Sequence, residues 1–149
     1  MARPTGDRPQ TILLRGCAHV QEEKEGKVAL SPGQLVLIDS NDQYILNNTT
    51  AGEISRICVV MENDTGGQTI KDSYAATDHV KTIIPLPGHI VQLRVAARAP
   101  AIVIGDQVQL NGAGGVQKIV SGKKPIGTAV EAVDNSSGSS AAWIKVEIM

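Results

Sequence analysis

Three glycines lie within four residues of this sequence, and their spacing is the first feature that could carry chemistry: Gly112, Gly114 and Gly115. A glycine-rich loop cradles phosphate when its backbone N–H groups stand at the start of a helix. The two common patterns are G-x-x-x-x-G-K-[ST] and G-x-G-x-x-G. The stretch GAGGVQKIV at residues 112–120 fits neither pattern, and its second half is typical of a strand. We therefore interpret the glycines as a turn between two strands.

A cysteine–histidine dyad is the second possibility, because residues two apart on a strand face the same side. Cys17 and His19 have this spacing. A reactive thiol needs an exposed and electropositive setting, whereas Cys17 and Cys58 both lie in apolar runs. We predict that both cysteines are buried, reduced thiols. No G-x-S-x-G motif offers a serine nucleophile, so we expect that the protein is not an enzyme.

The three histidines, His19, His79 and His89, have none of the spacings of a metal site. Zinc sites on a single segment show patterns such as H-E-x-x-H. We expect no metal and no other cofactor. A site that only the fold would assemble from all three histidines stays open as an alternative.

The composition is that of an ordinary globular domain. The chain has 149 residues, of which 42% are hydrophobic and 19% are charged, and its formal net charge is -1. A nearly neutral chain has no overall attraction to nucleic acid or to an anionic membrane. The scarcity of aromatic residues, two Tyr and one Trp, also argues against stacking on single-stranded bases. We expect neither nucleic acid nor a membrane as a partner.

No targeting segment is predicted. The first ten residues have no apolar stretch behind their charges, unlike a signal peptide. No apolar run approaches the roughly 20 residues that span a bilayer. We expect synthesis in the cytoplasm.

Short strand-like segments separated by turn residues recur from residue 11 onward. Segments about five residues long with Gly, Pro, Asn or Ser between them are typical of an all-β barrel or sandwich. We predict an all-β fold, a short-stranded antiparallel barrel or β-tulip-like domain, which occupies residues 11–149 as a single domain. Residues 69–77 weakly indicate a helix, residues 64–67 indicate a turn, and the charged run at residues 22–27 is interpreted as a solvated turn.

Two segments indicate which faces are buried. In AWIKVEIM, at residues 142–149, Ile144, Val146 and Ile148 share one face of a strand, and this face should meet a core. The run RICVVM at residues 56–61 is apolar almost throughout, which predicts burial on both sides.

The sequence also repeats a motif. Residues 30–46 and 102–118 superpose with an offset of 72, and a turn glycine matches in both copies, Gly33 and Gly105. Each copy has a strand, a polar turn and a second strand after this glycine. The polar turn is the glycine cluster in the second copy and SNDQ, at residues 40–43, in the first. Because Asn, Asp and Gly tolerate left-handed backbone, we interpret the copies as two versions of one hairpin.

The first ten residues are a candidate binding arm. Two prolines and a glycine exclude a helix or a central strand there, so we predict an extended segment. The candidate contact residues are Arg3, Pro4, Arg8 and Pro9.

A small basic cluster near the glycine turn is the second candidate. It consists of Lys118, Lys123 and Lys124. These lysines could contact an acidic partner surface, or they could lie in a solvated loop.

The second half of the chain resembles a known family. Its segments follow one another as YAATDHVKTIIPLPGHIVQLRVA, IVIGDQVQLNGAGGVQKIV and IGTAVEAVDNSSGSSAAWIKVEIM. A proline–glycine turn, a strand led by Gly-Asp, a glycine-rich hairpin, an IG-A-EAVDNS segment and a final strand like WIKVEI resemble the head decoration (cement) proteins of tailed bacteriophages. The earlier segment SPGQLVLID also fits, so the resemblance runs from about residue 27 to the end.

This resemblance implies a structural protein of the virion that lies on the outer capsid surface. Such proteins typically bind the expanded capsid, often as trimers, and reinforce it against the pressure of the packaged DNA. The implied partners are the major capsid protein and further copies of the same chain, as a homotrimer. We further hypothesise that the arm becomes ordered on the capsid by adding a strand to a sheet edge, while its arginines contact carboxylates.

Three other functions stay open at this point. The chain could be another part of the virion, such as a tail-tube or head-completion protein. It could be a stand-alone β-barrel module that binds a ligand or glycan, although such a module would be expected to expose more aromatic residues. It could also be a small enzyme that uses Cys17 or a histidine cluster assembled by the fold.

Overall fold

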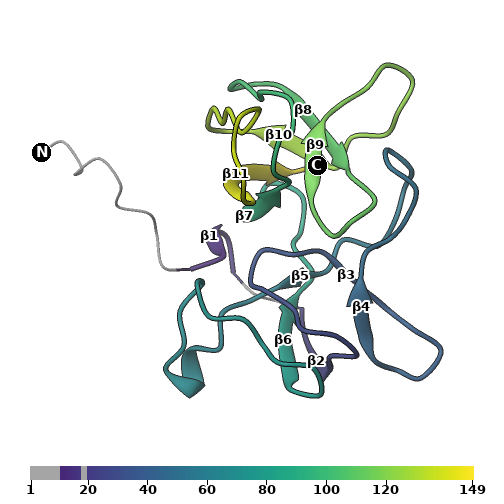
Figure 1. Cartoon of the computed structure of the whole chain (residues 1–149), viewed down its shortest axis with the longest axis vertical. Helices are drawn as coiled ribbons and strands as arrows, with labels where there is room; N and C mark the ends of the chain where they lie inside the picture. The colour runs from purple at the N-terminus through teal and green to yellow at the C-terminus, as the bar shows by residue number, and fades with distance from the viewer. Residues whose placement is uncertain (1–10, 18–19) are drawn as a thin grey trace, which may run out of the picture.

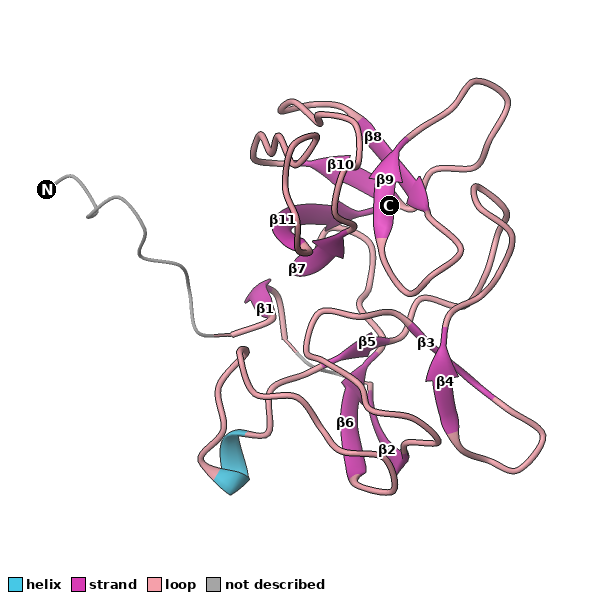
Figure 2. Cartoon of the chain, viewed as in Figure 1, coloured by secondary structure: helices cyan, strands magenta, loops and turns pink. Residues whose placement is uncertain are grey.

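The computed structural model describes residues 11–17 and 20–149 of the chain. These residues form an all-β fold, as predicted, and their single helical segment is the 3-10 turn η1 (Asp64–Gly66) (Figure 2). The strands of the described residues are β1 (Leu13–Arg15), β2 (Gln21–Glu25), β3 (Val36–Ile38), β4 (Tyr44–Leu46), β5 (Val59–Val60), β6 (His79–Ile83), β7 (Ile90–Val95), β8 (Gln107–Leu110), β9 (Val116–Lys118), β10 (Gly127–Ala129) and β11 (Ala142–Ile148).

The C-terminal half closes into a five-stranded barrel, which lies at the top of Figure 1. We call this barrel the second ring, because the N-terminal half forms a first one. Its strands are hydrogen-bonded in the order β7, β11, β10, β8 and β9, and β9 returns to β7. The closing pair, Val95 of β7 and Val116 of β9, is parallel, and the other pairs are antiparallel. The predicted barrel was wholly antiparallel, but strand direction cannot alternate all the way round a closed ring with an odd number of strands. The observed barrel is therefore mixed.

The N-terminal half forms an equivalent ring from β2 to β6, the first ring. β2 pairs with β6, β6 with β5, and β3 with β4, all antiparallel. Two isolated bridges complete the circle. Leu35, just before β3, pairs antiparallel with Val59 of β5, and Gly26, just after β2, pairs parallel with Tyr44 of β4. The parallel closure thus falls at the same place as in the second ring.

The two rings correspond strand by strand and residue by residue. The strands from β2 to β6 match those from β7 to β11 in order, with the same partners. Each cross-strand pair of the first ring has a counterpart in the second. Glu22–Thr82 corresponds to Val91–Val146, and Val59–Ile83 corresponds to Thr128–Glu147. Leu35–Val59 corresponds to Gln107–Thr128, and Gly26–Tyr44 corresponds to Val95–Val116. The chain therefore contains two copies of one strand topology.

The repeated hairpins have the same turn chemistry. In the first ring, Asp39 Oδ1 accepts the backbone N–H groups of Asn41 and Gln43, at 2.8 and 3.1 Å. In the second ring, Asn111 Oδ1 accepts the two equivalent N–H groups of the glycine cluster, at 2.8 and 3.0 Å. A carboxylate or amide that bonds to its own backbone in this way fixes a tight turn. The predicted repeat of one hairpin is confirmed.

Left-handed backbone also recurs at the same place in both turns. Asp42 has a φ of 61°, and Gly114, its equivalent, has a φ of 76°. Aspartate and glycine are among the residues that adopt this conformation most readily. SNDQ and the glycine cluster are thus two sequences for one backbone path, and the interpretation of the glycines as a turn is confirmed.

Two hydrophobic cores hold the rings together. The smaller core fills the first ring and includes Cys58 and Val60. The larger core fills the second ring and extends across the contact between the rings, where it includes Val59 and Ile83. Successive residues around β5 therefore face different cores, and the predicted burial of this run on both sides is confirmed. The predicted alternation in β11 is confirmed as well, because Ile144, Val146 and Ile148 are buried.

Two local predictions are wrong. Residues 69–77 form no helix, because Tyr74 is paired with Leu30 through two backbone hydrogen bonds and Thr77 has a φ of 74°. The charged run at residues 22–27 is not a turn, because most of it lies in β2, which pairs along its whole length with β6. Pairing with a strand distant in sequence outweighs the polar composition of this segment.

Although β1 belongs to the first half of the chain, it pairs with a strand of the second ring. Leu13 lies antiparallel to Val91 of β7, and the Gln92 N–H donates to the Ile12 carbonyl at 2.8 Å. Residues 1–10, the predicted arm with its four candidate contact residues, lie outside the described residues.

Candidate functional site, an acidic groove on the first ring

A polar groove crosses the outer face of the first ring over β2 and β6. Its floor includes Glu23 and Lys81, and its wall is the segment at residues 61–68. Two adjoining hollows share Glu23, Thr65 and Lys81, so we treat them as one groove. The charged side chains on this outer face are Glu23, Glu62, Asp64, Asp78 and Lys81, which makes the groove acidic.

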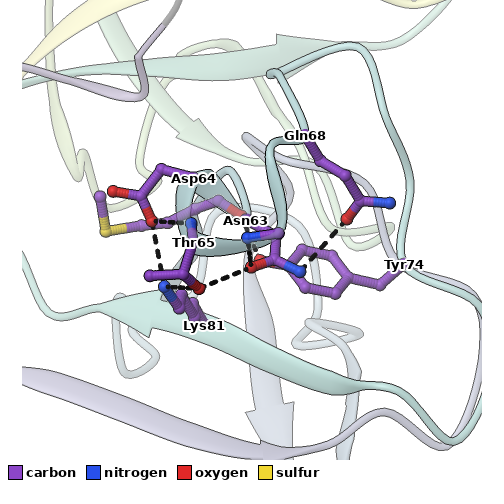
Figure 3. A network of polar contacts seen from close by, with 8 residues as sticks. Asn63, Asp64, Thr65, Gln68, Tyr74 and Lys81 are labelled. Carbon is purple, nitrogen blue, oxygen red and sulfur yellow. Dashed lines mark hydrogen bonds and ion pairs between the residues drawn. The ribbon is translucent and has the colours of Figure 1, made fainter.

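The wall of the groove is shaped by the turn η1, which Figure 3 shows from close by. Asn63 caps this turn, since its Oδ1 accepts the Gly66 N–H and the Thr65 hydroxyl, both at 3.2 Å. Gly67 ends the turn with a φ of 72°. The sequence Asn-Asp-Thr-Gly-Gly supplies both the cap and the left-handed residue, which is why the segment folds locally.

Lys81 ties the wall to the floor of the groove. Its Nζ lies 3.0 Å from Asp64 Oδ1 and donates to Thr65 Oγ1 at 2.8 Å (Figure 3). The hydrogen bond from Lys81 holds the pKa of Asp64 below its usual value. The charge of Lys81 is thus neutralised by Asp64, and the remaining carboxylates set the sign of the groove.

Tyr74 holds the wall of the groove in place through a hydrogen bond. The side chain is buried, and its hydroxyl donates to the Met61 carbonyl at 2.9 Å. Burial raises the pKa of Tyr74 to about 12, so the hydroxyl stays protonated at neutral pH. Tyr74 therefore acts as a structural donor and cannot serve as a general base.

Two carboxylates at the groove are open to a cationic partner. Glu62 accepts one backbone N–H, from Ile12, through Oε2 at 3.0 Å. Glu23 is exposed on β2, and no described residue pairs with its carboxylate. An arrangement of this kind suits an extended chain with basic side chains better than an anion.

A second polar cluster lies inside the first ring. The Tyr44 hydroxyl is 2.9 Å from Thr82 Oγ1 and 3.2 Å from Glu22 Oε2. Arg56 forms an ion pair with Glu22 at 2.7 Å, and this contact lowers the pKa of Glu22. In the second ring, valines stand at the positions of Glu22 and Tyr44. The first ring therefore has a polar end where the second is apolar.

The two cysteines differ in their exposure to solvent. Cys58 is 1% exposed, and burial raises the pKa of its thiol, which makes it a poor nucleophile. Cys17 is exposed, so the prediction of two buried thiols holds for Cys58 and is wrong for Cys17. Gly16, with a φ of 112°, directly follows β1 and precedes Cys17. His19, the other member of the possible dyad, lies outside the described residues.

The structure does not gather the three candidate lysines into one patch. Lys118 forms an ion pair with Asp106 at 2.8 Å, within the second ring. Lys123 pairs with Glu53 at 3.2 Å, on a loop of the first half of the chain. Lys124 lies beside it, and its backbone N–H donates to the Gly52 carbonyl at 2.8 Å. Carboxylates thus neutralise two of the three charges.

In the part of the chain that the structure describes, no group of three or more His, Cys, Asp or Glu side chains is arranged to hold a metal ion. His79 lies on β6 of the first ring, and His89 directly precedes β7 of the second. Over the same residues, no helix has the length and apolar character needed to cross a membrane.

Known proteins provide no further assignment. No protein-family model matches this chain, and no curated protein matches it significantly.

Sequence reasoning missed the groove because its parts are far apart in the chain. The turn at residues 64–67 was predicted, but its contact with Lys81 depends on the pairing of β5 with β6. Glu23 was assigned to a solvated turn, so its place on an open strand edge could not be seen. The one local signal was Asn-Asp-Thr-Gly-Gly, a capped turn, which marks a rigid loop without giving its neighbours.

Proposed function

We propose that this chain is a structural protein of a tailed-bacteriophage virion. It binds the outer surface of the capsid as a homotrimer and stabilises the expanded head. Its partners are the major capsid protein and other copies of itself, and it has no catalytic role.

One observation supports this proposal most directly. The segments that resemble head decoration proteins contain β7 to β11, and these strands are hydrogen-bonded into one closed ring. The segment SPGQLVLID is the equivalent turn and strand of the first ring. The resemblance therefore covers every strand of one closed ring, together with β6 of the first ring.

An exposed apolar turn offers a surface for contact between copies. Val103 and Ile104, just before β8, are 54% and 69% exposed. Their equivalents in the first ring, Ser31 and Pro32, lie in the turn that rests on the second ring, where the Pro32 carbonyl accepts Arg94 Nε at 3.0 Å. Exposed apolar side chains that lie together mark contact sites more often than single ones do. In the proposed trimer, the turn at Val103 and Ile104 of one copy contacts the next copy. This contact resembles the one that the turn at Ser31 and Pro32 makes with the second ring of the same chain.

The arm at residues 2–10 is the proposed grip on the capsid. The residues that follow it already add a strand to a sheet edge, because β1 pairs with β7. Strand addition supplies affinity through main-chain hydrogen bonds, and arginines add charge-assisted contacts. The same mode of contact would join the arm to an open edge of the capsid protein.

The decisive experiment is electron microscopy of expanded capsids incubated with the purified chain. We expect added density on the outer surface at three-fold positions, and a more stable shell on heating. Capsids that bind no chain, or particles that carry it in higher-order rings of the tail, would reject the proposal.

Two variants test its parts. Replacement of residues 2–10 by a Gly-Ser segment of equal length should reduce capsid occupancy while the chain stays folded by circular dichroism. Ile104→Asp should shift the trimer toward monomer in light scattering, whereas Ile54→Asp, at another exposed isoleucine, should leave its mass unchanged. Undiminished occupancy would disprove the role of the arm, and an unchanged mass for Ile104→Asp would disprove the contact.

A further inference from the structure

Before its bridge to β4 at Gly26, the outer edge of β2 is open, whereas the corresponding part of β7 is filled. β7 pairs with β11 on one edge, and on the other edge with β1 and then with β9. Gln92 uses its backbone N–H on this second edge, and its equivalent on β2 is Glu23. Among the described residues, no strand pairs with β2 at Gln21 or Glu23 on this side. An unpaired edge is a template for an added strand.

The N-terminal arm joins the folded chain at this groove. The Ile12 N–H donates to Glu62 Oε2 at 3.0 Å, and Gln92 Nε2 donates to the Thr11 carbonyl at 2.8 Å. Glu62 and Glu23 line the same hollow. The residues before Thr11 therefore start beside one carboxylate of the groove.

The arm is long enough to cross the groove. The Met61 N–H donates to the Lys81 carbonyl at 2.8 Å, and Lys81 lies opposite Glu23. These residues form a row across three strands, which spans about 10 Å at the usual spacing of two strand intervals. Arg8 is four residues before Ile12, and four extended residues reach about 13 Å. Arg8 can therefore meet Glu23 while Ile12 stays bound to Glu62.

The charges of the two segments are complementary. The groove has open carboxylates at Glu23 and Glu62, while Asp64 neutralises its one lysine. The arm offers two guanidinium groups, from Arg3 and Arg8, against one carboxylate, from Asp7. Arginine–carboxylate contacts are among the stronger polar contacts in proteins.

We propose that residues 2–10 of the same chain dock in the acidic groove of the free protein. Arg8 pairs with Glu23 while Ile12 stays bound to Glu62, and the backbone of the arm pairs with the open part of the β2 edge. This docking is a property of the isolated chain and does not depend on the capsid role proposed above.

Nuclear magnetic resonance on the full-length chain tests the docking at neutral pH and low salt. The readouts are the heteronuclear NOE of the arm amides and the hydrogen exchange of the Glu23 amide. In the natural chain we expect arm NOE values like those of the folded residues. Arg8→Glu should lower them and speed exchange at Glu23 about fivefold, the effect of one ion pair. The double variant Arg8→Glu with Glu23→Arg should restore both readouts.

Lys124→Glu is the matched control. It makes the same change in charge as Arg8→Glu, but on a loop that contacts residues 52–53 instead of the groove, and it should change neither readout. NOE values of a free chain in the natural protein, or unchanged exchange at Glu23 in Arg8→Glu, would overturn the proposal. Protection that disappears on tenfold dilution would overturn it too, because the arm would then come from a second copy.

Discussion

Arg94 of β7 stacks on Trp143 of β11, with its guanidinium carbon 3.6 Å from the centroid of the indole ring. Its Nε donates to the Pro32 carbonyl in the turn of the first ring, at 3.0 Å. One side chain therefore joins two strands of the second ring to the first ring. Burial lowers the pKa of Arg94, but the group stays charged at all ordinary pH values, so the contact persists across them.

The stacked pair should contribute measurably to stability. Arg94→Gln removes the cation over the ring and the hydrogen bond to Pro32. We expect the free energy of unfolding to fall by about 2 kcal/mol, from the combined loss of a partly buried cation–π contact and a charged donor. Urea titration followed by Trp143 fluorescence measures the change. Lys71→Gln, at an exposed position, is the control, and equal losses in the two variants would contradict the assignment.

The repeat provides a matched pair of glycines. Gly33 and Gly105 are equivalent and have φ values of 84° and 90°. A Cβ at Gly33 would overlap the Trp143 ring, whereas a Cβ at Gly105 would meet nothing within 4 Å. We expect Gly105→Ala to cost about 1 kcal/mol from backbone strain alone. Gly33→Ala should cost about 2 kcal/mol more, from overpacking. Similar unfolding midpoints for both variants would show that the Trp143 contact is unimportant.

The left-handed backbone of Asp42 should lower the stability of the protein relative to a glycine at this position. Its φ is 61°, and its carboxylate pairs with Lys24 at 2.7 Å on the surface. Asp42→Gly and Asp42→Ala both remove this ion pair, but only glycine relieves the backbone. We expect the glycine variant to be more stable than the alanine variant by about 1 kcal/mol, as measured by denaturant unfolding. The reverse order would mean that the turn has a different conformation.

Asp39 should make the free energy of unfolding depend on pH in the acid range. The hydrogen bond from Lys27, followed by the backbone N–H of Gln43, holds the pKa of Asp39 below its usual value. A carboxyl whose pKa is lowered by folding stabilises the fold above its unfolded pKa, about 3.9, and loses this contribution as pH falls through its folded pKa. Asp39→Asn keeps the Oδ1 acceptor, as Asn111 does in the second ring, but cannot titrate.

The natural chain should therefore be more stable than Asp39→Asn at neutral pH, and the difference should shrink as pH falls below about 4. Urea unfolding at a series of pH values measures this difference. A difference that stays constant over the whole range would show that Lys27 and the turn do not bind the charged form selectively.

Thiol labelling should distinguish the two cysteines. Cys17 is exposed and Cys58 is 1% exposed, and burial raises the pKa of the Cys58 thiol. We expect iodoacetamide to add one group to the native protein, at Cys17, and a second group only after denaturation. Intact mass and peptide mapping report the sites. Cys17→Ser should remain unlabelled while folded, and native labelling of this variant would mean that the first ring opens readily.

Local features of the fold were predictable from the sequence, and pairings between distant strands were not. The hairpins at Asp39 and Asn111 close through contacts within five residues, so turn chemistry and the 72-residue offset were enough to predict them. β2 was missed because its polar residues become a strand only through pairing with β6, about sixty positions away. One antiparallel barrel was predicted for residues 11–149, but the division into two rings and the parallel closure depend on the number and pairing of strands, which no local pattern states.

The candidate sites show the same limit. Lys118 and Lys123 are close in sequence, but Lys118 pairs with Asp106 of the same ring and Lys123 with Glu53 of the first half of the chain. Glu23 and Glu62 are far apart in sequence and line one groove. Proximity along the chain is thus a poor guide to a binding surface in a fold made of short strands, where most neighbours come from elsewhere.

The equivalence of the two rings has a consequence for how this protein can vary. Two units in one chain have a fixed one-to-one stoichiometry, and a short connection holds each at a millimolar effective concentration around the other. Dilution that would separate two single-ring proteins cannot separate these. Each ring can therefore carry residues that suit only its own position and still keep the neighbouring ring against its core. Glu22 and Tyr44, which stand where the second ring has valines, are an example.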